Sequence, residues 1–184
     1  MRSRKKQKKM SITEKKYKKL ALQVSLTGLS FCCFDTLNKK ILSYNEVHFD
    51  TFHKATKIEE LFADAFSDFP ELKDTYDEIV VIHNNTLSTF VPTALFEENY
   101  LGSYLQYNTK VFETDFFAYD TIANYEMNTV YIPYVNINNF LIDQLGSLNY
   151  KHANSILNTK ILETRKNNDN KKMVVHFNTG HFEI

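Results

Sequence analysis

The sequence predicts an α/β fold in which a mixed sheet is flanked by helices, because strand-like and helical segments alternate along the chain. Its 184 residues fit one domain of about 100–200 residues. Apolar residues make up 43% of the chain, which is enough for a sizeable core. The four glycines lie too far apart to form a P-loop or a G-x-G-x-x-G dinucleotide fingerprint, so both nucleotide-binding motifs are excluded.

The first third of the chain is predicted to form three strands and one helix. Alternating apolar residues predict strands at 20–25, 29–35 and 41–49. The Thr27-Gly28 dipeptide favours a tight turn between the first two strands, because glycine tolerates a positive φ. Thr56 and Glu59 form a capping box ahead of an apolar stripe of helical spacing, which Pro70 ends.

The middle of the chain is predicted to add three strands and a second helix. The strands are expected at 79–82, 87–91 and 129–135, with an extended aromatic segment at 111–119. The first two form a strand pair across the polar turn 83–86. Pro92 and Thr93 begin the helix, which carries Leu95, Leu101 and Leu105.

The last fifty residues are predicted to contain two helices and a hairpin. Asn136 caps the first helix, and Gly146 ends it in a left-handed conformation. A weaker helix at 155–165 and a polar linker at 166–172 follow. The chain then ends in two strand candidates around Thr179-Gly180.

The net charge of zero conceals two oppositely charged parts. Residues 1–19 contain ten basic side chains and one acidic side chain, a net charge of +9, so the rest of the chain carries −9. Such a run is predicted to be a disordered tail. It is either a solubilising extension, a segment ahead of a natural start at Met10, or a nucleic-acid arm at Lys5–Lys19. Nucleic acid is not the expected partner, because the acidic body offers no basic patch to continue the contact.

The apolar segment after the tail does not predict an export signal or a membrane span. Residues 20–34 are interrupted by polar side chains, and no other apolar run approaches 18 residues. Cys32 and Cys33 are adjacent, so they match neither a zinc ribbon nor a disulfide framework. We therefore expect a cytoplasmic protein with reduced thiols.

Four segments carry a resemblance to a known family. They are Leu22–Phe34 (LQVSLTGLSFCCF), Ile82–Pro92 (IHNNTLSTFVP), Tyr131–Phe140 (YIPYVNINNF) and Met173–Ile184 (MVVHFNTGHFEI). In these segments the stretch from residue 12 to 184 resembles the family called domain of unknown function 3822. The order of elements, together with a Thr-Gly turn near each end, is also similar to the actin-like ATPase superfamily of ribonuclease H-like fold, in its pilus-assembly branch.

The resemblance implies an actin-like first lobe and the beginning of a second. The chain would then divide into the basic tail 1–19, the first lobe 20–165, and a linker with the opening hairpin of a truncated second lobe at 166–184. Ile184 ends the chain inside an apolar strand. The resemblance therefore implies a longer protein.

In actin-like ATPases the turn of each hairpin grips nucleotide phosphates. The first hairpin of such ATPases carries a D-x-G-[ST] pattern, but here Ser25 and Thr27 stand in place of the Asp and the first Gly. The second hairpin has His176-Phe177-Asn178 where such ATPases carry their second Asp and Gly. A hydroxyl supplies no charge to magnesium, whose sites usually include a carboxylate. We therefore predict a degenerate nucleotide site formed by Ser25, Thr27, Gly28, Asn178, Thr179 and Gly180.

The favoured hypothesis is a non-catalytic actin-like scaffold or adaptor that binds a protein partner and needs no cofactor. The candidate partner surfaces are the aromatic segment Phe112–Tyr119, which could instead belong to the core, and the loop His83–Thr86. The alternative is an ATP- and magnesium-dependent switch with residual ATPase activity, which uses the hydroxyl and amide groups of the degenerate site.

No metal site or catalytic residue is predicted. His48, Asp50 and His53 are close in sequence, as are His176 and His181, for which Glu183 is the nearby third ligand. A metal would need a third ligand and an open position. Half-buried or surface imidazoles are the simpler interpretation of both groups.

Overall fold

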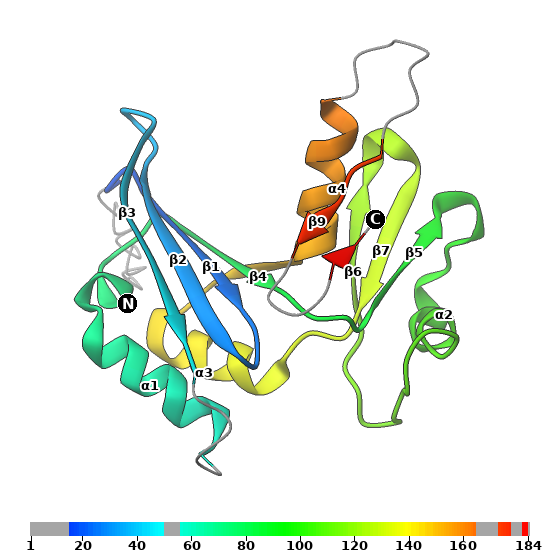
Figure 1. The fold of residues 1–184 in the computed structure, drawn as a ribbon, viewed down its shortest axis with the longest axis horizontal. Helices are drawn as coiled ribbons and strands as arrows, with labels where there is room; N and C mark the ends of the chain where they lie inside the picture. Colours follow the sequence, from blue (N-terminus) through cyan, green and yellow to red (C-terminus); the bar gives the residue numbers. More distant parts are fainter. Residues whose placement is uncertain (1–14, 50–55, 165–172, 178–181, 184) are drawn as a thin grey trace, which may run out of the picture.

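The computed structural model describes residues 15–49, 56–164, 173–177 and 182–183, and within them two sheets form two wings of the molecule (Figure 1). The larger sheet has the strand order β3-β2-β1-β4-β8. Its strands are β1 (Lys18–Val24), β2 (Gly28–Asp35), β3 (Lys40–His48), β4 (Glu78–His83) and β8 (Asn149–His152). β1, β2 and β3 are antiparallel neighbours, whereas β4 and β8 run parallel to β1. The predicted mixed sheet is therefore confirmed.

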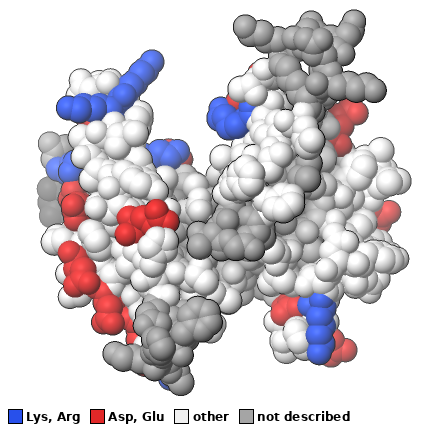
Figure 2. Space-filling model, viewed as in Figure 1, with Lys and Arg blue, Asp and Glu red and all other residues white. Residues whose placement is uncertain are grey.

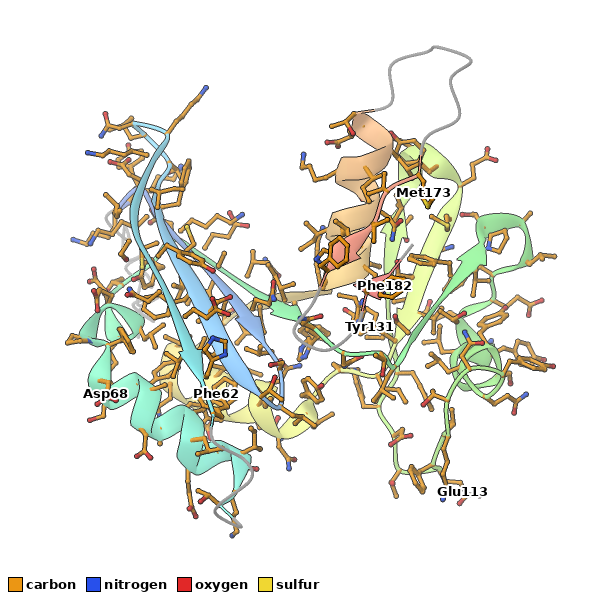
Figure 3. The ribbon with its side chains drawn as sticks, viewed as in Figure 1. Phe62, Asp68, Glu113, Tyr131, Met173 and Phe182 are labelled. Atoms are coloured by element: carbon orange, nitrogen blue, oxygen red, sulfur yellow. The ribbon has the colours of Figure 1, made fainter. Side chains whose placement is uncertain are left out.

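Two helices, α1 (Ile58–Asp68) and α3 (Val135–Leu145), cover one face of the larger sheet. Their apolar side chains pack on the buried, alternating residues of the strands. The centre of this core consists of Leu20, Leu22, Phe31, Phe62, Phe66, Val81, Ile137 and Leu141. Figure 3 shows Phe62 at this layer, between α1 and the sheet.

The opposite face of the larger sheet looks across a cleft toward the second wing (Figure 2). Ala21, Cys32 and Val80 point to this face, because they alternate with the buried residues of their strands and pair with one another across them. All three are only half-buried. The same face also carries the ion pair of Lys19 with Glu78, so the cleft wall combines small apolar and charged side chains.

The second wing is built around a three-stranded antiparallel sheet in the order β5-β7-β6. Its strands are β5 (Ser88–Pro92), β6 (Ala118–Ile122) and β7 (Met127–Tyr131), and the short helix α2 (Leu101–Leu105) packs on β5 and β7. A second small core forms here from Val91, Leu105, Val130 and Ile132. The prediction that 79–82 and 87–91 form a strand pair is wrong, since β4 and β5 belong to different sheets.

The predicted helix after Pro92 is also interrupted. Three-residue 3₁₀ turns occupy Thr93–Leu95 and Glu98–Tyr100, and the α-helical part begins only at Leu101. A third 3₁₀ turn spans Ala123–Tyr125, and a 3₁₀ helix at Pro70–Lys73 follows α1. Between the first two turns the Tyr104 hydroxyl fixes the extended backbone, because it accepts the Glu97 N–H at 2.9 Å and donates to the Leu95 carbonyl at 2.7 Å.

Two predicted helix caps are wrong. The N-cap of α1 is Lys57 rather than Thr56, and the N-cap of α3 is Tyr134 rather than Asn136; neither N-cap side chain makes a capping hydrogen bond. Gly146 does end α3 with a positive φ of 80°, as predicted, but its ψ of −135° lies outside the predicted left-handed helical conformation. The N-terminus of α3 is held by a distant residue instead, because the Tyr134 N–H donates to His83 Nδ1 at 3.3 Å.

The chain ends beside the second wing. Helix α4 (Ala153–Glu163) contacts β6, β7 and β8. The strands β9 (His176–Phe177) and β10 (Phe182–Glu183) form the predicted terminal hairpin, with Phe177 opposite Phe182. None of the described helices is long and apolar enough to cross a membrane.

The first strand begins within the predicted tail. Lys18 and Lys19 belong to β1, where Lys18 Nζ lies 2.6 Å from Asp74 Oδ2 and Lys19 Nζ lies 2.8 Å from Glu78 Oε1. Residues 1–14, which hold most of the tail's charge, lie outside the described residues. These two lysines therefore belong to the folded lobe.

Candidate functional site

The turn between β1 and β2 holds the first half of the predicted nucleotide site. The Ser25 hydroxyl donates to the Gly28 carbonyl at 3.0 Å and accepts from the Thr27 N–H at 3.2 Å, and it lies 3.2 Å from the Thr27 hydroxyl. The Ser25 N–H also donates to the Gly28 carbonyl. The structure thus brings Ser25, Thr27 and Gly28 together in a turn whose side-chain hydrogen bonds are local. Asn178, Thr179 and Gly180 lie outside the described residues.

Gly28 is required by the neighbouring strand. A Cβ at this position would lie 2.4 Å from the Val47 carbonyl oxygen of β3, which is shorter than any van der Waals contact. Gly28 is buried and pairs with His48 in the β2–β3 ladder. Its lack of a side chain therefore permits the close approach of β3, which explains the glycine without any ligand.

A cavity of about 310 Å³ opens beside this turn. It lies between the turn, the beginnings of α1 and α3, and the segment 114–116. Its apolar lining consists of Leu26, Ile58, Phe116, Ile132, Pro133, Val135 and Ile137. The charged residue among the lining residues is Asp115, whose carboxylate accepts the Phe112 N–H at 2.8 Å. Such a lining suits an apolar group better than a phosphate, which needs cationic or N–H donors.

A buried polar cluster, which sequence reasoning missed, lies where β4 and β8 end and meet the second wing. His83 and His152 are the last residues of these two parallel strands, are paired in register, and are fully buried. Asp120 of β6 and Tyr131 of β7 join them from the second wing, and Figure 3 shows Tyr131 at this junction. The carboxyl ends of parallel strands are the usual place for ligand sites in α/β folds, so the free hydrogen-bonding capacity of the cluster decides whether it could be one.

Both ring nitrogens of His83 are occupied. The Tyr134 N–H donates to Nδ1, so the proton lies on Nε2, which donates to Asn138 Oδ1 at 3.0 Å. Burial lowers the pKa of His83 to about 4, the hydrogen bond with Asn138 opposes this shift, and the neighbouring His152 adds to it. His83 is therefore a neutral, structural imidazole at neutral pH.

His152 and Asp120 connect the two wings. The Asn154 N–H donates to His152 Nδ1, and His152 Nε2 donates to Asn85 Oδ1 at 3.3 Å. The Asp120 carboxylate accepts three hydrogen bonds, from the His152 N–H at 2.8 Å, the Ser155 hydroxyl at 2.5 Å and the Tyr131 hydroxyl at 3.3 Å. Burial and the Asp120 charge raise the pKa of Tyr131. The cluster is internally satisfied, and its arrangement is that of a structural junction.

The described residues contain no group of three or more side chains placed to hold a metal ion. His48 Nε2 lies 3.5 Å from Glu46 Oε1, whereas Asp50 and His53 are outside the described residues. His176 pairs in register with Glu183, and His181 is also outside the described residues. The pairing of His176 with His181 thus stays untested.

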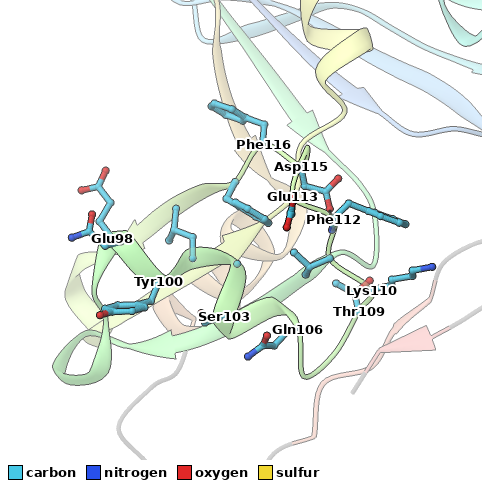
Figure 4. Close-up of a pocket in the computed structure, with 15 residues that line it drawn as sticks. Glu98, Tyr100, Ser103, Gln106, Thr109, Lys110, Phe112, Glu113, Asp115 and Phe116 are labelled. Atoms are coloured by element: carbon cyan, nitrogen blue, oxygen red, sulfur yellow. Dashed lines mark hydrogen bonds between the residues drawn. The ribbon is translucent and has the colours of Figure 1, made fainter.

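The segment 109–117 and helix α2 form a groove of about 760 Å³ in the second wing (Figure 4). Tyr100, Phe112 and Phe116 line it with half of their side-chain surface exposed, at 53–54%. The predicted partner segment Phe112–Tyr119 therefore contains both exposed and core-facing aromatic residues. Phe112, Phe116 and Tyr119 are exposed, whereas Phe117 packs on the core of the second wing.

The prediction of an exposed partner loop at His83–Thr86 is wrong for most of its length. His83 is buried. The Asn85 side chain is used in two hydrogen bonds within the protein: its amide donates to the Ile132 carbonyl at 3.0 Å, and its oxygen accepts the Leu87 N–H at 2.8 Å. Thr86 is the exposed residue of the four.

Comparison with known proteins bears on the fold and the family. The family model described as "Protein of unknown function (DUF3822)" matches residues 7–184. No curated protein sequence matches the chain significantly.

Two solved structures are similar. A crystal structure from Bacteroides thetaiotaomicron VPI-5482, of a protein with an actin-like ATPase fold and unknown function, superimposes with a TM-score of 0.72 at 18% identity, covering 85% of this chain and 60% of that one. The cytoplasmic domain of EpsL, an inner membrane component of the type II secretion system of Vibrio cholerae, matches with a TM-score of 0.44 at 15% identity, covering 73% of this chain and 53% of that one. The chain thus spans little more than half the length of these structures, and its fold is the actin-like one.

Proposed function

The chain belongs to the DUF3822 family, and from that premise we propose that it is a non-catalytic actin-like scaffold that binds a protein partner. The observation that carries this proposal is the β1–β2 turn. By the resemblance to actin-like ATPases it corresponds to a phosphate-binding turn, yet its Ser25 hydroxyl is bonded within the turn and it has no carboxylate. The groove of Figure 4 supplies the surface for a partner.

The region around the turn has little that a metal–nucleotide complex could use. Mg²⁺ is usually held by one or two carboxylates together with substrate phosphates. Asp115 is the carboxylate on the adjacent cavity, and it already accepts the Phe112 N–H. The apolar lining of that cavity also opposes the burial of a triphosphate, since unpaired charge is costly away from water.

The groove has the chemistry of a protein interface. Exposed aromatic side chains are enriched at such interfaces, where they supply a large contact area with few rotatable bonds. Here Tyr100, Phe112 and Phe116 are accompanied by charged side chains at the rim, among them Glu98 and Lys110. Lys110 Nζ lies 4.9 Å from the centre of the Phe112 ring, so the ring face is already held by a cation.

The first experiment tests nucleotide binding by titrating ATP with Mg²⁺ into the full chain in a calorimeter and measuring the melting temperature. We expect neither heat nor a shift of the melting temperature. Binding would be visible, because a ligand at 100 times its dissociation constant stabilises the fold by about 2.7 kcal/mol. A saturable heat that disappears in Ser25→Ala/Thr27→Ala would contradict the scaffold and support the nucleotide-dependent switch.

The second experiment tests the groove by site-specific photocrosslinking in cells. A crosslinking amino acid at Phe116 is expected to trap one discrete partner, and Phe112→Ala should abolish that product. The matched control carries the same amino acid at Tyr107, which is 84% exposed and does not line the groove. Equal products from both positions, or no product from Phe116, would rule out the groove as the partner surface.

A further inference from the structure

Strand β3 is a free edge of the larger sheet. Within the described part of the chain it pairs with β2 on one side, so its other side presents unpaired N–H and C=O groups. Ile41, Leu42 and Tyr44 on this strand are 58%, 48% and 62% exposed. The strand is nine residues long, contains no proline, and carries charges only toward its ends. An edge of this length and composition favours pairing with another strand.

We propose that β3 pairs antiparallel with β3 of a second copy of this chain, with Tyr44 facing Tyr44 of the other copy at a two-fold axis. The two five-stranded sheets become one continuous sheet across this axis. Such an interface is self-complementary and closes as a dimer, because each copy uses its one β3 edge.

The centre at Tyr44 follows from the sequence of the strand. Tyr44 is the middle residue of Lys40–His48, so this register pairs the whole strand, and a centre at Ser43 or Asn45 shortens the ladder. Two exposed tyrosine rings then face each other as a cross-strand aromatic pair.

The Ser43 side chain supports the same register. Its hydroxyl oxygen is buried and has no hydrogen-bond partner within the described residues. In the Tyr44-centred ladder, Ser43 lies opposite Asn45 of the second copy. Both residues point to the helix-covered face, since they pair with Cys33 and Phe31 in β2. Directly opposed side chains have Cβ atoms about 4.5–5.5 Å apart, so the Asn45 amide can reach a rotated Ser43 hydroxyl.

A bulge in β3 interrupts the regular strand. The β2–β3 register shifts between Cys33 and Phe34, which leaves Leu42 as an extra residue in β3. Bulges at sheet edges restrict pairing with other chains. This bulge lies outside the central residues Ser43–Asn45, so it leaves the centre intact and disfavours pairing in shifted registers.

Disulfide trapping tests the dimer and its register in the full chain. Cys32 faces Tyr44 across β2 and β3, so the background is Cys32→Ser/Cys33→Ala. In that background Tyr44→Cys, Ser43→Cys and Asn45→Cys are each oxidised at tens of micromolar protein and separated on a non-reducing gel.

We expect Tyr44→Cys to give a covalent dimer, because two cysteines at the axis meet the geometry of a disulfide. Ser43→Cys and Asn45→Cys should each give no covalent dimer when oxidised alone, and should form a covalent dimer when the two variants are mixed. No Tyr44→Cys dimer, or equal crosslinking of all three variants alone, overturns the proposal, and a dimer from Ser43→Cys alone overturns the register.

Sedimentation velocity tests the same interface without a covalent bond. The wild-type chain should sediment as a dimer, and Tyr44→Lys should raise the dimer dissociation constant at least about tenfold, because like charges then face each other. Tyr107→Lys is the matched control and should stay dimeric, since Tyr107 is exposed outside β3. Circular dichroism verifies that both variants are folded. A monomeric wild type, or an unaffected Tyr44→Lys, overturns the proposal.

Discussion

Two polar regions lie at the same end of the larger sheet and differ in what they hold together. The β1–β2 turn closes its side-chain hydrogen bonds among Ser25, Thr27 and Gly28. Next to it, the hydrogen bonds of His83 and His152 to other elements join residues between 32 and 67 positions apart. The side chains of the turn are thus satisfied by its own residues, although its backbone also receives the Phe49 N–H at the Thr27 carbonyl, whereas the side chains of the buried cluster are satisfied only when both wings are assembled. The side-chain hydrogen bonds of the cluster therefore specify how the two wings assemble, and those of the turn do not.

The largest test of this difference is Asp120→Ala. It leaves the His152 N–H and the hydroxyls of Ser155 and Tyr131 without their acceptor at a part-buried site. Buried donors without a partner cost about 1–3 kcal/mol each, so we expect a loss of about 3–5 kcal/mol of unfolding free energy. Urea unfolding measures it. Asp143→Ala on the exposed surface of α3 is the control, and a loss equal to that control would contradict the structural role of the cluster.

The second test uses pH. The pKa of His83 is lowered from its ordinary 6.5 to about 4, so below about pH 6.5 the unfolded chain binds a proton that the folded chain does not. Stability due to this group is present above pH 6.5 and is lost as the pH falls toward 4, by up to about 3 kcal/mol. Urea unfolding between pH 7 and pH 4.5 should show this loss. His83→Gln replaces the imidazole with an amide, which can still hydrogen-bond but cannot titrate. An unchanged pH dependence in that variant would contradict the assignment.

The difference between the two regions also explains what sequence reasoning could predict. The strands of the β1–β2 hairpin have period-two burial, and this local signal predicts them to within two residues. Gly28, however, belongs to β2 and does not have the positive φ on which the predicted Thr-Gly turn was based. The polar strand β8 has no such signal, because its sequence, Asn-Tyr-Lys-His, forms a strand only by pairing with β4. Local patterns are sufficient where the stabilising contacts are local.

His83 shows the limit most clearly. It follows a buried apolar strand and precedes two asparagines, which is the pattern of a surface turn, and so it was expected in an exposed loop. Its partners Tyr134 and Asn138 are more than fifty residues away. The same long-range contact explains the misplaced cap of α3, since the Tyr134 N–H is held by His83 rather than by a neighbouring side chain. The available signal is a histidine directly after the apolar run that ends at Ile82; His152 offers none, because the strand that it ends has no pattern of its own.

The third test asks whether the glycine of the turn serves the sheet. Gly28→Ala places a Cβ against the Val47 carbonyl oxygen, so β3 must move, and we expect a loss of about 1–3 kcal/mol. Gly102→Ala is the matched control. Its Cβ would lie 3.1 Å from the tip of the Phe117 ring, which can shift, and alanine favours the helix, so the change should stay within about 0.5 kcal/mol of wild type. Thermal and urea unfolding measure both. Equal effects would remove the packing explanation for Gly28.

The smallest effect is expected at the hydroxyls of the turn itself. Ser25→Ala removes the hydroxyl's hydrogen bond to the Gly28 carbonyl, which the Ser25 N–H still satisfies, and the acceptor of the exposed Thr27 N–H, which water can replace. Thr27→Ala removes a contact on an exposed side chain. Each change should therefore cost less than about 1 kcal/mol in urea unfolding. A cost approaching that of Asp120→Ala would mean that the turn is part of the same cooperative network as the buried cluster. The distinction between a locally satisfied turn and a junction that specifies the fold would then fail.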